Sequence, residues 1–64
     1  MRTGINYKLF EARREAGISQ AAFAERIGMD RMTYGYIEGN KWNTSIQEKQ
    51  LIADGLNVAV EELF

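Results

Sequence analysis

A chain of 64 residues that contains neither cysteine nor histidine must hold its fold by side-chain packing alone. The lack of cysteine excludes a disulfide scaffold, and without thiolates or imidazoles the usual zinc site cannot form. The length allows a single domain over residues 1–64 with one small core, and it leaves little room for a deep catalytic pocket. We therefore expect a binding domain rather than an enzyme, with no cofactor and no metal.

Charge is distributed unevenly along the sequence, although the net charge is only −1. Residues 1–42 carry seven Lys and Arg against five Asp and Glu, whereas residues 43–64 carry one Lys against four Asp and Glu. This asymmetry would orient the molecule on a polyanion, although chance scatter explains it equally well. No apolar run approaches the roughly 18 residues of a membrane span, and no signal peptide is evident, so we expect a cytoplasmic protein.

Glycine punctuates a sequence that has no proline, and the segments between the glycines have the composition and periodicity of helices. Gly17 and Gly28 are expected to adopt the left-handed conformation that ends a helix. The sequence predicts five helices, over residues 5–16, 20–27, 31–38, 46–55 and 60–63.

Polar residues mark the starts of three of these helices. Ser19 and Asp30 are expected to be N-caps of the second and third helices. Thr44 and Ser45 both have the capping-box spacing, so either could begin the fourth helix. Gly55 lies inside that helix at a cost of about 1 kcal/mol relative to Ala, which suggests a close approach to a neighbour.

Apolar residues recur on one face of each predicted helix and give the expected core. In chain order these inward residues are Ile5, Leu9, Ala12, Ala16, Phe23, Ala24, Ile27, Tyr34, Ile37, Leu51, Ile52 and Leu56.

The stretch from residue 20 to residue 37 reads as two short helices joined by a tight turn. Ala24 is small where the two helices would cross, and Gly28 suits the turn. Tyr34 and Ile37 are expected to face back onto Ala24 and the first helix. A bent helix pair with a glycine turn is the helix-turn-helix, whose second helix enters the major groove of DNA.

An ordered set of residues runs through the chain at fixed spacings: Arg13, Gly17-Ile18-Ser19-Gln20, Phe23-Ala24, Ile27-Gly28, Ile37-Glu38, Ile52-Ala53, Leu56-Asn57-Val58 and Glu62-Leu63. With this set, the sequence resembles the phage-repressor helix-turn-helix family of the Cro/CI or XRE type over about residues 5–64. The resemblance implies an all-α, compact five-helix, lambda-repressor-like DNA-binding domain with the helix-turn-helix in helices two and three. It also implies a sequence-specific double-stranded DNA-binding transcriptional regulator, a repressor rather than an activator, with the third helix in the major groove of an operator.

The resemblance further implies which residues contact DNA. Relatives reach base edges at the positions of Arg31, Met32 and Tyr36. They contact the DNA backbone at the positions of Gln20, Thr33, Asn40, Lys41, Trp42 and Asn43. The chemistry agrees in part, because an arginine can bond guanine O6 and N7 together whereas a methionine can touch only apolar groups such as the thymine methyl.

These residues also have purely structural interpretations. Arg31 could be a solvated first-turn residue, although a cation is unfavourable at that end of a helix. Met32 and Tyr36 could be packing residues. Three more residues have an alternative that involves no contact with DNA. Thr33 could be an ordinary surface residue, Gln20 an ordinary first-turn residue, and Trp42 a lid over the core.

Other features of the resemblance concern stability and assembly. Arg13 and Glu38 match a structural ion pair between the first and third helices. Val60 and Phe64 lie where relatives pair, which predicts a weak homodimer, formed alone or only on DNA, unless both residues complete the core. A rival function is a protein-interaction module such as an antitoxin or anti-repressor, which the small number of basic residues favours.

The sequence departs from the family pattern at several positions, including Thr44, Lys49 and Ala59, where relatives carry proline, an apolar residue and Ser or Thr. Relatives usually carry an aliphatic residue at the position of Tyr34. They also have glycine one position later than Gly39, so Asn40 is expected to take the left-handed conformation here.

Overall fold

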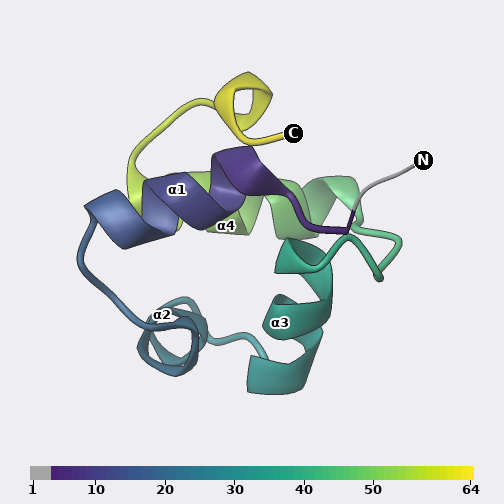
Figure 1. Cartoon of the computed structure of the whole chain (residues 1–64), viewed down its shortest axis with the longest axis horizontal. Helices are drawn as coiled ribbons and strands as arrows, with labels where there is room; N and C mark the ends of the chain where they lie inside the picture. Colours follow the sequence, from purple (N-terminus) through teal and green to yellow (C-terminus); the bar gives the residue numbers. More distant parts are fainter. Residues whose placement is uncertain (1–3) are drawn as a thin grey trace.

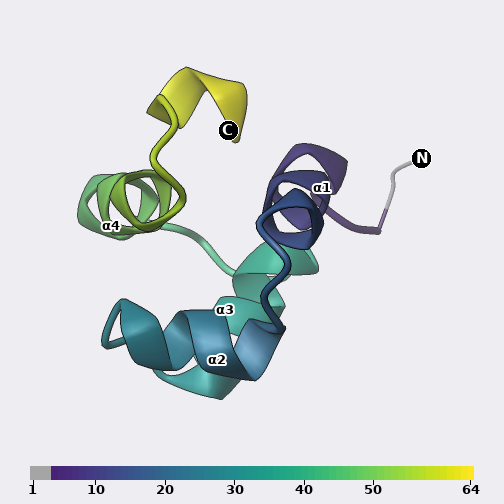
Figure 2. The same ribbon diagram turned by 90° about the vertical axis from the view of Figure 1, so that its left-hand side faces the viewer.

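The computed structural model describes residues 4–64. It contains four α-helices and one short 3-10 turn: α1 (Tyr7–Glu15), α2 (Gln20–Arg26), α3 (Arg31–Glu38), α4 (Ile46–Leu56) and η1 (Val60–Glu62). Figure 1 shows α1 and α4 side-on, with η1 at one side of this pair and α2 and α3 at the other. In Figure 2 the view runs along α1 and α4, and α2 is seen side-on next to α3.

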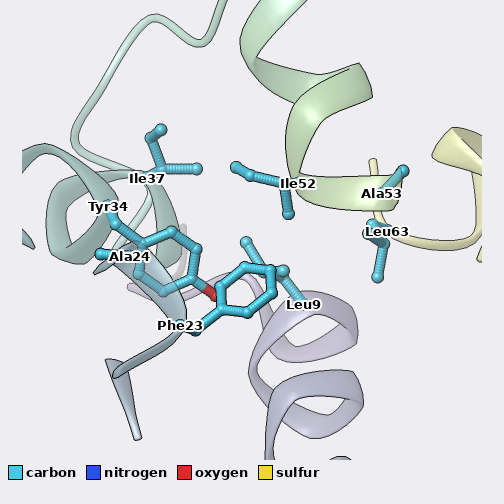
Figure 3. Close-up of a cluster of buried hydrophobic side chains, with 8 residues drawn as sticks. All are labelled: Leu9, Phe23, Ala24, Tyr34, Ile37, Ile52, Ala53 and Leu63. Carbon is cyan, nitrogen blue, oxygen red and sulfur yellow. The ribbon is translucent and has the colours of Figure 1, made fainter. Parts of the chain in front are cut away.

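The core lies where the four helices meet, and all four contribute buried side chains to it (Figure 3). Leu63, just after η1, closes it on the side of α1 and α4. The expectation of one small apolar core is confirmed. Its fully buried members are Leu9, Phe23, Ala24, Tyr34, Ile37, Ile52, Ala53 and Leu63.

Side-chain caps fix where the helices begin. The Ser19 hydroxyl accepts the backbone N–H of Ala22 at 3.1 Å, which confirms it as the N-cap of α2. Ser45 caps α4 through a reciprocal capping box with Glu48, which decides between the two predicted starts. Asp30 caps α3, as expected from its position.

The four helices end in the same way, with a residue of positive φ just beyond the last turn. These residues are Gly17, Gly28, Asn40 and Asn57. After α3, for example, the N–H of Asn40 donates to the Ile37 carbonyl and the N–H of Lys41 donates to the Tyr36 carbonyl. This is the Schellman pattern, and asparagine is the non-glycine residue that best tolerates it. The left-handed conformations predicted for Gly17, Gly28 and Asn40 are confirmed.

The fold differs from the expected one at both ends. Asn6 is the N-cap of α1 and accepts the backbone N–H of Leu9 at 3.2 Å, so the helix starts at Tyr7 and Ile5 lies outside it. The prediction of five helices is wrong, because the last element is only a 3-10 turn. The N–H groups of Glu62 and Leu63 donate to carbonyls three residues earlier, and this single turn suffices to bring Leu63 into the core.

Two predictions for α4 have different outcomes. The inward position predicted for Leu51 is wrong, since the residue is 41% exposed. Successive side chains on a helix point about 100° apart, and it is Ile52 that points into the core. The close approach at Gly55 is confirmed, since a Cβ atom there would lie 2.6 Å from Cγ2 of Ile27 and 3.0 Å from the Phe23 ring. Over residues 4–64, no helix has the length and apolar character to cross a bilayer.

Candidate DNA-binding surface

α2 and α3 are packed together in the bent arrangement that the sequence predicts for residues 20–37 (Figure 2). The Phe23 ring meets the Tyr34 ring edge-on, with centroids 5.3 Å apart. Ala24 is only 1% exposed, so its small side chain lies within the packed region. Gly28, at φ +73°, turns the chain between the two helices. This packing leaves the opposite face of α3 free to meet a ligand.

The start of α3 presents an exposed cation on a capped first turn. The Asp30 carboxylate accepts the backbone N–H groups of Met32 at 3.1 Å and Thr33 at 3.2 Å, which fixes this turn. Arg31 is exposed and forms no ion pair or side-chain hydrogen bond with any residue in the range 4–64. Its guanidinium therefore keeps all its donors available for an acceptor outside the chain.

A shallow hollow of about 460 Å³ brings together predicted site residues from α2, α3 and the following loop. Met32 and Tyr36 are 65% and 44% exposed there, so neither of them is a packing residue of the core. Gly35 of α3 and Gly39, the residue that follows α3, also line the hollow. The predicted site residues that it unites are Gln20, Arg31, Met32, Tyr36 and Lys41.

The other predicted site residues do not line this hollow. Thr33 is half-buried on α3. Asn40, Trp42 and Asn43 line a second hollow of about 560 Å³, between the start of α1, the α3–α4 loop and the end of the chain. The predicted contact set thus falls into two neighbouring groups.

Trp42 contacts residues of both α3 and α4. Its ring is stacked on Tyr36, with centroids 6.3 Å apart and planes 14° apart. Its indole N–H donates to the Glu48 carboxylate at 3.3 Å. Trp42 is 43% exposed, so it is not itself a member of the buried core.

A buried polar network around Glu38 ties α1, α2 and α3 together. The predicted ion pair is present, with Arg13 Nε 2.7 Å from one carboxylate oxygen and a terminal guanidinium nitrogen 3.0 Å from the other. The Tyr34 hydroxyl donates to the first oxygen at 2.7 Å, and the Gln20 amide donates to the second at 2.9 Å. Arg13 also donates to the Ile18 carbonyl at 2.7 Å. Each carboxylate oxygen therefore accepts two bonds.

This network determines the ionisation of its members. Burial alone would raise the pKa of Glu38, but the hydrogen bonds from Arg13, Tyr34 and Gln20 outweigh it and hold that pKa below its ordinary value. Burial, and then the bond to Glu38, raises the pKa of the Tyr34 phenol. The hydrogen bond to Glu38 raises the pKa of Arg13 despite its burial. At neutral pH the network is thus an ionised carboxylate held by three donor side chains.

Gln20 joins the buried network to the exposed hollow. One hydrogen of its amide nitrogen is donated to Glu38, and the second remains for another acceptor. Sequence reasoning missed its role in the network, and that of Tyr34. The available signal was a tyrosine at a core position one helical turn before Glu38, since a buried phenol needs a hydrogen-bond partner.

The two predicted dimer residues have different surroundings. Val60 is half-buried and packs against the core, in line with a structural role. Phe64 is 37% exposed, and the Lys49 ammonium lies 5.5 Å from the centre of its ring. Phe64 is therefore the more exposed apolar residue of the two.

The sequence is similar to a known family and to known proteins. The sequence matches the helix-turn-helix family over residues 9–63, from within α1 to just after η1. It is 40% identical over 58 residues to the control protein C.MunI of Mycoplasma sp, covering 89% of this chain and 78% of that protein. It is 34% identical over 64 residues to an uncharacterized HTH-type transcriptional regulator of Archaeoglobus fulgidus, covering 100% of this chain and 86% of the relative.

A solved structure shares the fold as well. The crystal structure of the restriction-modification controller protein C.AhdI from Aeromonas hydrophila superposes with a TM-score of 0.86. The two sequences are 32% identical, and the match covers 92% of this chain and 89% of that one. The arrangement of helices around the exposed face of α3 is thus common to both proteins.

Proposed function

Because the chain belongs to the helix-turn-helix family of DNA-binding transcriptional regulators, which is not a family of enzymes, we propose that it is a repressor that reads a short operator. In this proposal α3 enters the major groove with its first turn leading. The observation that carries the proposal is the hollow that joins Arg31 at the start of α3 to Gln20 on α2 and Lys41 on the loop. A base reader there shares one hollow with groups that can bind phosphate.

Each residue of the hollow has a contact that suits its chemistry. Arg31 bonds guanine O6 and N7 as a bidentate donor, and Met32 touches a thymine methyl group. Tyr36 contacts a sugar or donates a single hydrogen bond to a base edge. Gln20 donates its second amide hydrogen to a phosphate while Glu38 holds the first.

The remaining members of the predicted set serve the DNA backbone. Lys41 supplies a charge in the hollow, and Asn40 and Asn43 supply amides from the exposed loop. Thr33 lies next to Met32 at the first turn of α3 and is assigned to the sugar-phosphate chain. Trp42 is left out of this set because its N–H is already donated to Glu48.

We further propose that two copies pair weakly, alone or only on DNA, through the region of Phe64 and Val60. Two-fold pairing places two copies of α3 about 34 Å apart, which is one turn of DNA. The expected operator is then two-fold symmetric. Sedimentation at millimolar concentration tests this, and a monomer there together with selected sites that lack two-fold symmetry contradicts it.

The names of the relatives suggest what is regulated. C.MunI is a control protein and C.AhdI a restriction-modification controller, so we propose that this chain controls restriction-modification genes next to its own. It acts in the cytoplasm, where such genes are transcribed. A reporter fused to the promoter beside the gene tests this, because a repressor lowers expression and an activator raises it.

The experiment that tests the function is selection of bound sites from a random duplex pool, followed by binding isotherms on selected and scrambled duplexes. We expect a defined site and a salt dependence that corresponds to roughly 3–6 phosphates per domain, with a slope of about −0.9 per phosphate. A protein-interaction module would give no enriched site and an affinity for duplex DNA that does not depend on salt. That result would exclude the regulator and leave the rival function.

A further inference from the structure

We infer that Trp42 sets the base preference of this protein through Tyr36, by holding the Tyr36 ring at a fixed angle on the outward face of α3. The inference rests on the proposed function and assigns Trp42 as a positioning residue rather than a phosphate contact. It follows from three features: the stacked rings, the anchoring of the indole on α4, and the exposure of Tyr36.

The stack joins a reading residue to a supporting one. The two ring planes are only 14° apart, with centroids 6.3 Å apart, so the indole and the phenol are nearly parallel in an offset stack. Tyr36 lines the hollow that contains Arg31, whereas Trp42 does not. The indole therefore restricts the Tyr36 ring without occupying the hollow that contains Arg31.

The indole is itself held by the start of α4. Its N–H donates to Oε1 of Glu48, and the same oxygen accepts the backbone N–H of Ser45 at 2.9 Å within the capping box. That backbone bond lowers the pKa of Glu48, so the acceptor is ionised at neutral pH. The Thr44 hydroxyl also donates to the Trp42 carbonyl at 3.4 Å. The start of α4 thus sets the position of the ring against α3.

A tyrosine on an exposed helix face would otherwise sample several rotamers. Fixing a side chain on binding costs on the order of 0.5–1.5 kcal/mol, which corresponds to about two- to tenfold in affinity. In the free protein the stack already removes part of that freedom. Loss of the indole should therefore weaken binding to the preferred duplex by about two- to tenfold, and binding to a scrambled duplex much less.

The decisive experiment is a double-mutant cycle on the selected duplex, with Trp42→Ala, Tyr36→Ala and the double variant. If Trp42 acts through Tyr36, Trp42→Ala has no further effect once Tyr36 is gone. A direct contact between the indole and phosphate predicts additive losses instead. Leu51→Ala is the matched control, because Leu51 is 41% exposed on α4 and lies outside both hollows.

Two further readouts separate positioning from a purely structural role. Trp42→Phe keeps a ring for stacking and loses the N–H, so it should restore most of the base preference that Trp42→Ala loses. Trp42 is the only tryptophan of the chain, so its fluorescence reports the stack directly. Tyr36→Ala should shift that emission in the absence of DNA, while the melting temperatures of these variants stay close to that of the unaltered protein.

Each result has a definite meaning. Additive losses in the cycle, an emission spectrum that Tyr36→Ala does not change, or an unaltered base preference in Trp42→Ala would each overturn the inference and leave the proposed function intact. An unaltered protein that shows no preference among duplexes would overturn the proposed function, and the inference with it.

Discussion

Replacement of Arg13 by alanine should destabilise the fold far more than its effect on net charge suggests. The change removes three hydrogen bonds and leaves the Glu38 carboxylate, 3% exposed, with only Tyr34 and Gln20 as donors. It also leaves the Ile18 carbonyl without its donor. Removing one partner of a buried ion pair costs about 3–5 kcal/mol. Arg13 is 9% exposed, so water can reach the gap, and we expect about 3 kcal/mol.

That loss is large for a chain of this size. A stability of about 0.05–0.15 kcal/mol per residue gives roughly 3–10 kcal/mol for 64 residues. Arg13→Ala should therefore lower the urea midpoint strongly or unfold the protein at 25 °C. Arg14→Ala is the matched control, because it removes the same charge from the next, exposed position of α1. Equal urea midpoints for the two variants would refute the assignment of Glu38 as a carboxylate that depends on Arg13.

Three further predictions concern the stability of the fold. The folded pKa of Glu38 lies below its ordinary value of 4.5, so its contribution to stability is full above that pH and is lost as the pH falls through the folded pKa. Urea unfolding between pH 7 and pH 3 should show this, and Glu38→Gln should flatten the decline; an equally steep decline in that variant contradicts the prediction. Gly55→Ala should lower the unfolding free energy by about 1–2 kcal/mol, because the new Cβ meets Ile27 at 2.6 Å and the gain in helix propensity is smaller than the overpacking cost. Gly35→Ala, whose Cβ has only an ordinary contact at 3.6 Å, should instead leave stability unchanged or raise it by up to about 1 kcal/mol, and a loss in thermal unfolding would contradict this.

Local chemistry explains which parts of the fold are predictable from the sequence. A capping serine such as Ser19 and a turn glycine such as Gly28 act within a few residues, and both behave as expected. The predicted start of α1 is wrong because the apolar periodicity extends back to Ile5. The helix itself begins only after Asn6, whose side chain caps it by accepting the N–H of Leu9. Adjacent apolar residues in α4 give no basis for choosing Ile52 over Leu51, since that choice depends on how α4 packs against the rest of the core.

The candidate site also has features that local patterns predict and features that they do not. An outward position for Arg31, Met32 and Tyr36 follows from the periodicity of α3 together with the family resemblance. The bonds of Gln20 and the stack of Trp42 join residues on different helices and loops, so no local pattern contains them. Three-dimensional packing alone brings them together.

The central claim is that the outward face of α3 reads base sequence, and the most direct measurement compares unaltered protein with Arg31→Ala on selected and scrambled duplexes. Arg31 is exposed and unpaired among residues 4–64, so thermal stability should stay nearly unchanged. We expect a loss of about 1–3 kcal/mol in specific binding, a relaxed preference at one base pair, and a much smaller change on the scrambled duplex. A variant that keeps the full sequence preference, or that loses affinity equally on both duplexes, would contradict the account.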